Sequence, residues 1–395
     1  MNPDRIRAVG AGGAGAASSP RPNRFRLMPV SPAPLLWGLT ALAAVAVAAG
    51  VAILPATPAA AVDHAVILEY HHVGTDTPPS TSVTPETFEA HLGYLAEHDY
   101  HVWPLPRLLK RLEAGRSLPE RTVALTFDDA YASVYTEAYP RLAERGWPFT
   151  VFVSTDYIDK GYAGFMEWDQ LRELADNGAA IGNHSRSHPH LARPRRGDSR
   201  SAWLERVRAE IRQAQDRLAA ETEDPVRIFA YPFGEFSAPV REMVADLGFY
   251  GVGQQSGAVG PTSDLTAAPR FPLSGTTDMV AFATKVRSRA LPAEVLAPGD
   301  GVLEPDADKP ALRLRIPAGP YRLEALACYA SGQGRIEVEW RDRDAGKVMV
   351  RPQKALAPGR TKYNCTAPSS ETNGVFYWYS FLWMKPNPDG SWYAD

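Results

Sequence analysis

A strand pattern that ends on two carboxylates constrains this chain more than any other feature. Residues 123–127 read V-A-L-T-F, and Asp128 and Asp129 follow directly. A continuous apolar run of this kind is typical of a buried strand in a parallel sheet, and active sites of such folds gather at the carboxyl ends of the strands. Because neighbouring carboxylates repel each other unless a cation or a shared proton is present, we predict a metal site here.

Strand and helix patterns alternate along residues 65–273, which predicts an α/β fold with a parallel sheet or barrel. Thr84 is the expected N-cap of the first helix. Strands are expected at residues 65–70, 123–127, 149–153, 179–182, 227–231, 250–253 and 270–273, and helices at 85–97, 107–114, 135–145, 168–177, 202–220 and 238–247.

A different pattern follows a stretch rich in Pro, Gly and Asp at residues 292–310. Short alternating stretches, separated by turn residues, predict a small antiparallel β domain, so we expect a catalytic domain at 63–296 and a β-rich accessory domain at 297–395. Its two cysteines fit either one disulfide across a sandwich or two unrelated thiols. Its late aromatic residues fit either a β core or a platform for sugar rings. The alternating stretches are 312–316, 321–329, 335–340, 347–350 and 375–383, and the two cysteines are Cys328 and Cys365.

The first 62 residues predict export. They carry five arginines against one aspartate, then an uncharged apolar run at 35–54 and a small-residue cleavage site at 59–61. The apolar run is also long enough to span a bilayer, so a cleaved signal peptide and a retained membrane anchor both stay open. Either one predicts a periplasmic, cell-envelope anchored or secreted protein. The formal net charge of −3 gives nucleic acid no attraction.

Two histidines downstream strengthen the case for a metal. His184 and His188 are four residues apart in N-H-S-R-S-H, so both rings can face one point. Such a pair is a weak signal by itself, because the chain has nine histidines. Its place after an expected strand, together with Asp128 and Asp129, supplies two imidazoles and a carboxylate, which is the layout of a hydrolytic metal site.

Three motifs in this order resemble a known family. T-F-D-D at 126–129, H-S-x-x-H at 184–188 and Y-P-F-G at 231–234 are similar to the polysaccharide deacetylases of carbohydrate esterase family four, with their NodB homology domain. L-E-Y-H-H-V at 68–73 resembles the branch that acts on poly-β-1,6-N-acetylglucosamine in biofilms. The resemblance covers residues 66–273 and implies a distorted parallel (β/α) barrel with fewer than eight repeats.

Site residues follow from the resemblance, position by position. It implies Asp129, His184 and His188 as metal ligands, with Asp128 as the general base. A water activated by the metal would lose its proton to Asp128 and attack the acetamide carbonyl, and the backbone N–H of Phe233 would hold the oxyanion. We expect a divalent metal, zinc first, although cobalt and nickel also suit two imidazoles and a carboxylate.

One departure from the family concerns the residue that supports the base. Many members carry an arginine just before the P-Y-G turn, and this chain has Ala230 there. Arg227, earlier in the same strand, is one replacement. Arg270, on chain order alone, is a second candidate to pair with Asp128.

A second departure concerns the general acid. Many members use a late histidine in an L-x-H motif, whereas this chain has no histidine after His190. His71 and His72, at the end of the first expected strand, remain as candidates to protonate the leaving amine. A structural role for these two imidazoles is the alternative.

Three functions are compatible with these features. The favoured one is an exported, metal-dependent hydrolase that removes N-acetyl groups from a polysaccharide of N-acetylated amino sugars, with a poly-N-acetylglucosamine-like exopolysaccharide first and peptidoglycan or chitin oligomers as alternatives. Partners would be the polysaccharide, the membrane through the apolar segment, and an exopolysaccharide export machinery. The second is a catalytically impaired carbohydrate-binding or export/assembly protein. The third, a phosphatase, leaves the paired histidines unexplained.

Overall fold

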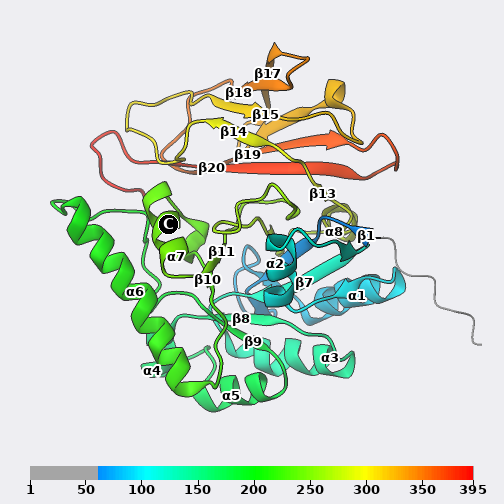
Figure 1. Cartoon of the computed structure of the whole chain (residues 1–395). Coiled ribbons are helices and arrows are strands. Elements are labelled where there is room, and N and C mark those ends of the chain that lie inside the picture. Colours follow the sequence, from blue (N-terminus) through cyan, green and yellow to red (C-terminus); the bar gives the residue numbers. More distant parts are fainter. Residues whose placement is uncertain (1–60, 395) are drawn as a thin grey trace, which may run out of the picture. The chain divides into compact units, whose positions relative to one another are not determined.

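Seven parallel strands curl into a barrel in this computed structural model, which describes residues 61–394 (Figure 1). Their order in the sheet is β11-β10-β9-β8-β7-β2-β12, and β5 (His101–Val102) pairs with β7 beside β8. The expected signal peptide or anchor lies outside the described residues, apart from 61–62. The barrel strands are β2 (Val66–Tyr70), β7 (Thr122–Phe127), β8 (Thr150–Val153), β9 (Ala180–Asn183), β10 (Ile228–Ala230), β11 (Tyr250–Val252) and β12 (Phe271–Pro272).

Backbone hydrogen bonds close the ring of strands. β12 pairs with β2, and the segment just before β12 bonds back to the other edge, because Ala268 N donates to Gly251 O at 2.8 Å and Gly253 N donates to Ala268 O at 3.0 Å. The prediction of a distorted parallel (β/α) barrel with fewer than eight repeats is confirmed.

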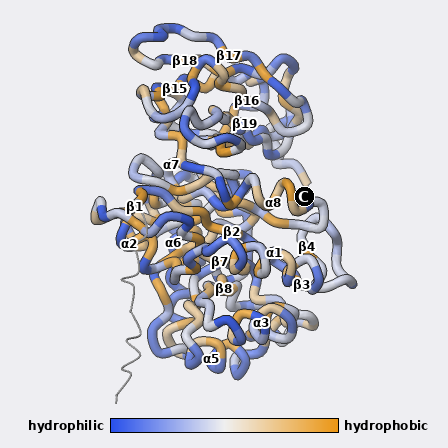
Figure 2. Tube along the Cα trace, turned by 90° about the vertical axis from the view of Figure 1, so that its right-hand side faces the viewer, coloured by the Kyte–Doolittle hydropathy of each residue, from blue (hydrophilic) through white to orange (hydrophobic). Residues whose placement is uncertain are grey.

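The barrel strands are buried on both faces. Every residue of β2 and β7 is buried, and alternate residues enter different clusters. Leu68 and Leu125 pack in the cluster that contains residues of most surrounding helices, whereas Ile67 and Ala124 pack with residues of β8, β10, β11 and the helix at 105–113. Apolar segments gather along these strands in Figure 2. Burying one Leu or Ile side chain contributes about 1.5–3 kcal/mol, which explains why these runs do not alternate with polar residues.

Helices follow most of the barrel strands, and Thr84 caps α1 as predicted by accepting from Thr87 N at 3.1 Å. The helix expected at 135–145 is present, but its first half is not α-helical. There a π-helix covers Val134–Ala138, directly before Pro140, which has no N–H to donate. The α-helices are α1 (Pro85–Glu97), α2 (Leu105–Glu113), α3 (Tyr139–Glu144), α4 (Thr155–Asp159), α5 (Trp168–Asp176), α6 (Arg200–Glu221), α7 (Ala238–Asp246) and α8 (Met279–Val286).

Two small pairs of strands complete this part of the chain: β1 (Ala61–Val62) with β6 (Leu118–Pro119), and β3 (His72–Val73) with β4 (Ser82–Val83). Within residues 61–394, no helix is both long and apolar enough to cross a membrane.

The second sheet is antiparallel except for its β13–β20 pair, and β17 connects its two halves by pairing with β16 and then with β18. The sequence analysis missed β19 and expected a strand at 321–329, where a 3-10 turn precedes β16. The domain boundary at 296/297 stays a prediction; β13 lies before it in the chain and β14 crosses it. The strands are β13 (Arg289–Ala290), β14 (Glu294–Ala297), β15 (Leu312–Arg315), β16 (Ala327–Ala330), β17 (Gly334–Asp342), β18 (Lys347–Arg351), β19 (Gly359–Pro368) and β20 (Phe376–Lys385).

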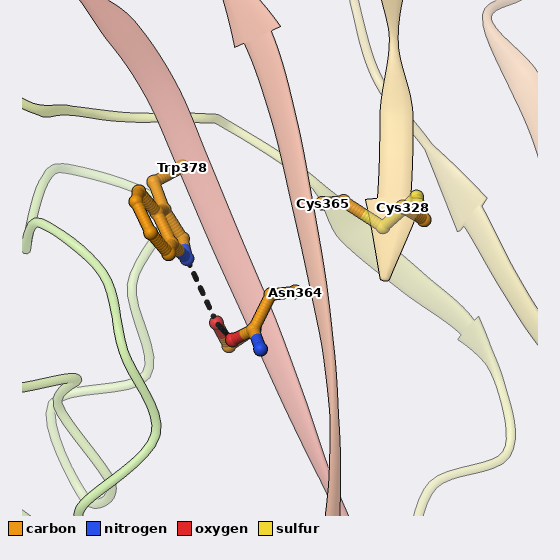
Figure 3. Close-up of a disulfide and its surroundings, with 5 residues drawn as sticks. Cys328, Asn364, Cys365 and Trp378 are labelled. Carbon is orange, nitrogen blue, oxygen red and sulfur yellow. Dashed lines mark hydrogen bonds between the residues drawn. A yellow bond between two sulfur atoms is a disulfide. The ribbon is translucent and has the colours of Figure 1, made fainter. Parts of the chain in front are cut away.

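The two cysteines form a disulfide between neighbouring strands (Figure 3). Cys328 and Cys365 are directly opposite in the register of β16 and β19, so the bridge lies within one layer, and the expectation of a bridge across a sandwich was wrong.

Aromatic side chains of β20 are divided between two cores. Trp383 is buried among the residues of the second sheet, whereas Trp378 packs against Phe271 of the barrel, with ring centroids 5.2 Å apart. The strand therefore contributes mainly to packing.

Candidate active site

The two carboxylates after β7 are both buried and face different partners. Arg270 donates twice to Asp128, from Nη1 to Oδ1 and from Nη2 to Oδ2, each at 2.7 Å. Asp129 instead faces His184 and His188, whose Nε2 atoms each lie 3.3 Å from Asp129 Oδ1. The backbone at Asp129 is left-handed, with φ 72°, so the chain turns sharply between the two groups.

Asp129, His184 and His188 fit a divalent cation. One donor atom from each lies within 4.8 Å of the others, and together they offer one carboxylate oxygen and two imidazole nitrogens, a donor set suited to a metal with an open coordination position. Asp129 Oδ1 is buried and has no hydrogen-bond partner within the described part of the chain. A buried carboxylate oxygen without a partner is unfavourable, and a cation would satisfy it.

Different neighbours orient His184 and set the protonation of His188. Nδ1 of His184 lies 2.8 Å from Ala230 O, so an N–H there leaves the Nε2 lone pair directed at Asp129. Burial lowers the pKa of His184, but the neighbouring carboxylates of Asp129 and Asp128 together outweigh it and raise that pKa. Burial, followed by the charge of His184, lowers the pKa of His188 to about 4. His188 is therefore neutral at pH 7, as a metal ligand must be.

A small hydrogen-bonded turn sets the spacing of the histidines. Ser185 N donates to Asn183 Oδ1 at 2.9 Å, and His188 N donates to Ser185 Oγ at 3.0 Å. Helix α6 holds the same turn, because Ser187 N donates to Glu210 Oε2 at 2.9 Å. Ser185 therefore shapes the turn through its hydroxyl.

Unfavourable backbone conformations are concentrated at this site. Of the seven non-glycine residues with positive φ within the described range, four are in its three motifs and a fifth, Ala130, directly follows the first motif; the four are Asp129, Ser185, His188 and Phe233. Such conformations cost of order 1–3 kcal/mol each and persist only where the surroundings hold them, commonly at functional sites.

The turn at Pro232–Gly234 brings Phe233 beside the histidines. Phe233 is left-handed, with φ 60° and ψ 5°, and its ring centroid lies 4.5 Å from that of His188. Gly234 also has positive φ, and a Cβ there would stand 2.6 Å from Cβ of Gln254. Position 234 therefore requires glycine both for its conformation and for the close approach of the next strand.

Arg270 supports Asp128, and Arg227 does not. Beyond its two bonds to Asp128, Arg270 donates from Nε to Gly253 O at 2.9 Å and from Nη1 to Thr126 Oγ1 at 3.1 Å. Arg227 is exposed just before β10, and its Nη1 donates to Leu247 O at 3.4 Å. Burial raises the pKa of Asp128, but the Arg270 charge and hydrogen bonds outweigh it and lower that pKa. The carboxylate therefore stays ionised.

Glu69 is a buried residue that the sequence analysis did not single out. Neither carboxylate oxygen has a hydrogen-bond partner within residues 61–394; Arg270 Nε lies 3.6 Å and His71 Nε2 3.8 Å away. Burial raises its pKa, more than Arg270 lowers it. Glu69, His71 and Asp128 also offer three donor atoms within 4.8 Å, but Arg270 already occupies both oxygens of Asp128. The sequence signal that could have identified Glu69 is its position as an acidic residue inside an otherwise apolar strand.

The two candidate acids lie in different environments. His71 follows β2, and its ring approaches both Asp128 and Glu69. His72 stacks on Tyr131 with ring centroids 3.5 Å apart. From Tyr131 the aromatic contacts continue to Phe165 at 4.8 Å and on to Tyr157 at 4.9 Å, which forms a row of partly exposed rings beside the metal-ligand cluster.

Comparison with known proteins finds sequences and structures similar to the barrel among deacetylases. A family model described as polysaccharide deacetylase matches residues 115–252. The poly-beta-1,6-N-acetyl-D-glucosamine N-deacetylase of Staphylococcus epidermidis is 27% identical over 203 residues, which is 49% of this chain and 68% of that protein. The Escherichia coli protein of the same name is 22% identical over 258 residues, 56% of this chain and 38% of the relative.

A solved structure with the same fold is the Streptococcus pyogenes deacetylase PplD in complex with acetate. The two share 21% sequence identity with a TM-score of 0.51, and the superposition covers 56% of this chain and 98% of that chain. At this identity the likeness concerns the fold of the barrel alone.

Proposed function

This chain carries a domain of the polysaccharide deacetylase family at residues 115–252, and from that premise we propose that it is an exported, metal-dependent N-deacetylase. Its substrate would be a polysaccharide of N-acetylated amino sugars, and poly-β-1,6-N-acetylglucosamine is the first candidate. The matches to two poly-beta-1,6-N-acetyl-D-glucosamine N-deacetylases support this choice of polymer. Peptidoglycan and chitin oligomers are the alternatives.

One observation carries the proposal: a partnerless carboxylate oxygen of Asp129 faces two imidazole nitrogens at 3.3 Å, directly beside an ionised, arginine-bound Asp128. A protein that only bound carbohydrate would have no need for this arrangement, which combines ligands for a cation with a separate carboxylate base. Zinc suits the donor set best, and cobalt or nickel would also bind it.

In the mechanism that we propose, each residue has a separate task. A divalent cation held by Asp129, His184 and His188 would supply Lewis-acid polarisation of the acetamide carbonyl and of a water. Asp128 accepts the proton of the attacking water, and Arg270 keeps that carboxylate in position and ionised before the attack. The backbone N–H of Phe233 donates to the oxygen on which negative charge develops.

The leaving amine requires a proton, and we assign its donor to His71. His71 has a nitrogen within 4.8 Å of an oxygen of Asp128 and of Glu69, so a proton has a short route between these groups. His72 is stacked on Tyr131, which suits a role in forming the wall of the sugar groove.

Export and partners remain part of the proposal. The arginine-rich segment and apolar run of residues 1–54 support an exported protein, in the periplasm, anchored in the cell envelope or secreted. An exopolysaccharide export machinery and, through the apolar run, the membrane are the partners that this location suggests.

The test is acetate release from soluble poly-β-1,6-N-acetylglucosamine oligomers, followed together with bound metal. The wild type should release acetate, lose that activity with a chelator and regain it with zinc. Asp128→Asn should bind metal as the wild type does and release acetate at least about 100-fold more slowly. Asp129→Asn and His188→Ala should lose metal and activity together.

Asp246→Asn, an exposed carboxylate on α7, is the matched control and should change neither quantity. If no acetate appears from this polymer, peptidoglycan and chitin oligomers are tested next. Metal binding without acetate release from any of the three would contradict the enzyme assignment and favour a carbohydrate-binding protein.

A further inference from the structure

Two basic side chains of strand β19, in the second sheet, donate to backbone carbonyl oxygens beside the candidate active site. Arg360 Nη1 donates to Phe233 O at 2.8 Å, and Lys362 Nζ donates to Gln254 O at 2.6 Å. The two residues are two positions apart and so project from the same face of the strand. Gln254 is the residue that packs against Gly234. Both bonds therefore hold the Pro232–Gly234 turn and the segment beneath it.

A buried carboxylate next to the turn connects further parts of the chain. Glu235 is fully buried; it accepts from Arg193 Nε at 2.8 Å and from the Tyr393 hydroxyl at 2.8 Å, and Nδ1 of His190 lies 3.0 Å away. Arg360 Nε lies 3.8 Å from Glu235 Oε1. His190 and Arg193, which follow the two candidate metal ligands in the chain, thus meet Arg360 of β19 and Tyr393 near the C-terminus. All four surround Glu235, two residues after Phe233.

Phe233 needs such support because of its backbone. A left-handed conformation is unfavourable for a non-glycine residue and persists only where neighbouring groups hold it. A hydrogen bond to the carbonyl oxygen of Phe233 fixes the plane of the peptide that follows it. The stacking of Phe233 on His190, with ring centroids 3.9 Å apart, holds the side chain. Arg360 supplies the hydrogen bond, and it comes from outside the barrel.

We propose that Arg360 is a positioning residue for the oxyanion site, so that the C-terminal β domain forms part of the catalytic machinery. By holding Phe233 O, Arg360 keeps the turn in the conformation that directs the Phe233 N–H toward the reacting oxygen. This inference rests on the proposed function, because it assumes that the Phe233 N–H stabilises the oxyanion. Arg360 acts on the turn and does not itself contact the reacting atoms.

The experiment compares Arg360→Ala and Arg360→Lys with Arg313→Ala, an exposed arginine on β15 of the same sheet. Removing an oxyanion donor typically lowers kcat about 100- to 1000-fold, and Arg360 acts only through that donor, so we expect a loss of about 10- to 100-fold for Arg360→Ala. KM, zinc affinity and Tm should stay close to the wild type. Arg360→Lys should recover part of kcat, because lysine still donates one hydrogen bond.

Amide hydrogen exchange over residues 231–236 is measured in the same three variants and does not depend on activity. Faster exchange in Arg360→Ala than in Arg313→Ala, together with the selective loss of kcat, would support the inference. Unchanged exchange, a rise in KM with kcat intact, or a loss of zinc affinity equal to that of kcat would each overturn it. A wild type that releases no acetate would instead refute the proposed function, while exchange would still decide whether Arg360 holds the turn.

Discussion

Replacing Arg270 by methionine should strongly destabilise the protein, and the structure sets the size of the effect. Arg270 is fully buried and donates four hydrogen bonds of 2.7 to 3.1 Å, two of them to Asp128. Methionine keeps the aliphatic stem but removes the only guanidinium that contacts Asp128 within the described residues. The buried carboxylates of Asp128 and Glu69 would then lack a compensating charge.

Breaking a buried ion pair by removing one partner costs about 3–5 kcal/mol, a large share of the 5–15 kcal/mol that stabilises a typical domain. The loss should depend on pH. Without Arg270 the largest effect that opposes burial is gone, and the pKa of Asp128 should rise above its ordinary value of 3.8. Above pH 3.8 the folded protein must then keep an uncompensated charge or take up a proton that the unfolded chain does not hold. The deficit relative to wild type should therefore be largest near pH 7 and shrink as the pH approaches 3.8.

Urea unfolding of Arg270→Met, Asp128→Asn and the double variant measures this coupling, with Arg227→Met as the control at an exposed arginine. The double variant should recover about 2 kcal/mol relative to the sum of the two single losses, because removing the Asp128 charge relieves the defect. The control should stay within about 0.5 kcal/mol of wild type. Strictly additive losses, or a deficit that grows toward acid pH, would refute the reasoning.

Three further outcomes follow from buried groups. Burial raises the pKa of Glu69 above 4.5, so the free energy of unfolding should fall as the pH rises from 4.5, and Glu69→Gln should remove that part of the slope. Burial lowers the pKa of His91 from 6.5 to about 4. The free energy of unfolding of the wild type should therefore fall by up to about 3 kcal/mol as the pH falls from 6.5 to 4. A His91→Gln variant that shows the same fall would contradict this. The Cys328–Cys365 bridge joins residues 37 apart, and removing it should lower the free energy of unfolding by about 4 kcal/mol. Thermal unfolding of the variant with both cysteines replaced by serine, compared with wild type, measures this.

Some elements could not be predicted from local pattern. Strand β19 reads G-R-T-K-Y-N-C-T-A-P, in which most side chains are polar or small. It is a strand because its neighbours β16 and β20 supply hydrogen bonds on both sides. Arg360 and Lys362, which alternate with its buried residues, contact the barrel. Its side chains alternate between buried and more exposed positions, but the buried ones are Thr, Tyr, Cys and Ala, which give only a weak apolar pattern.

The sequence by itself determined the local parts of the site. Three short segments can be identified from adjacent residues: the buried strand that ends in Asp128 and Asp129, the histidine pair at 184 and 188, and the Y-P-F-G sequence at 231–234. The left-handed backbone of Phe233 within the last of them is held by contacts from outside the barrel.

The tertiary structure decided which distant groups complete the site. Arg270 meets Asp128 across 142 residues and Arg360 meets Phe233 across 127, while Glu69 lies buried beside both Arg270 and His71. A charged side chain can be identified in the sequence, but its partner is set by closure of the barrel and by packing of the second sheet against it. These are long-range contacts, and the free energy that selects them is spread over both cores.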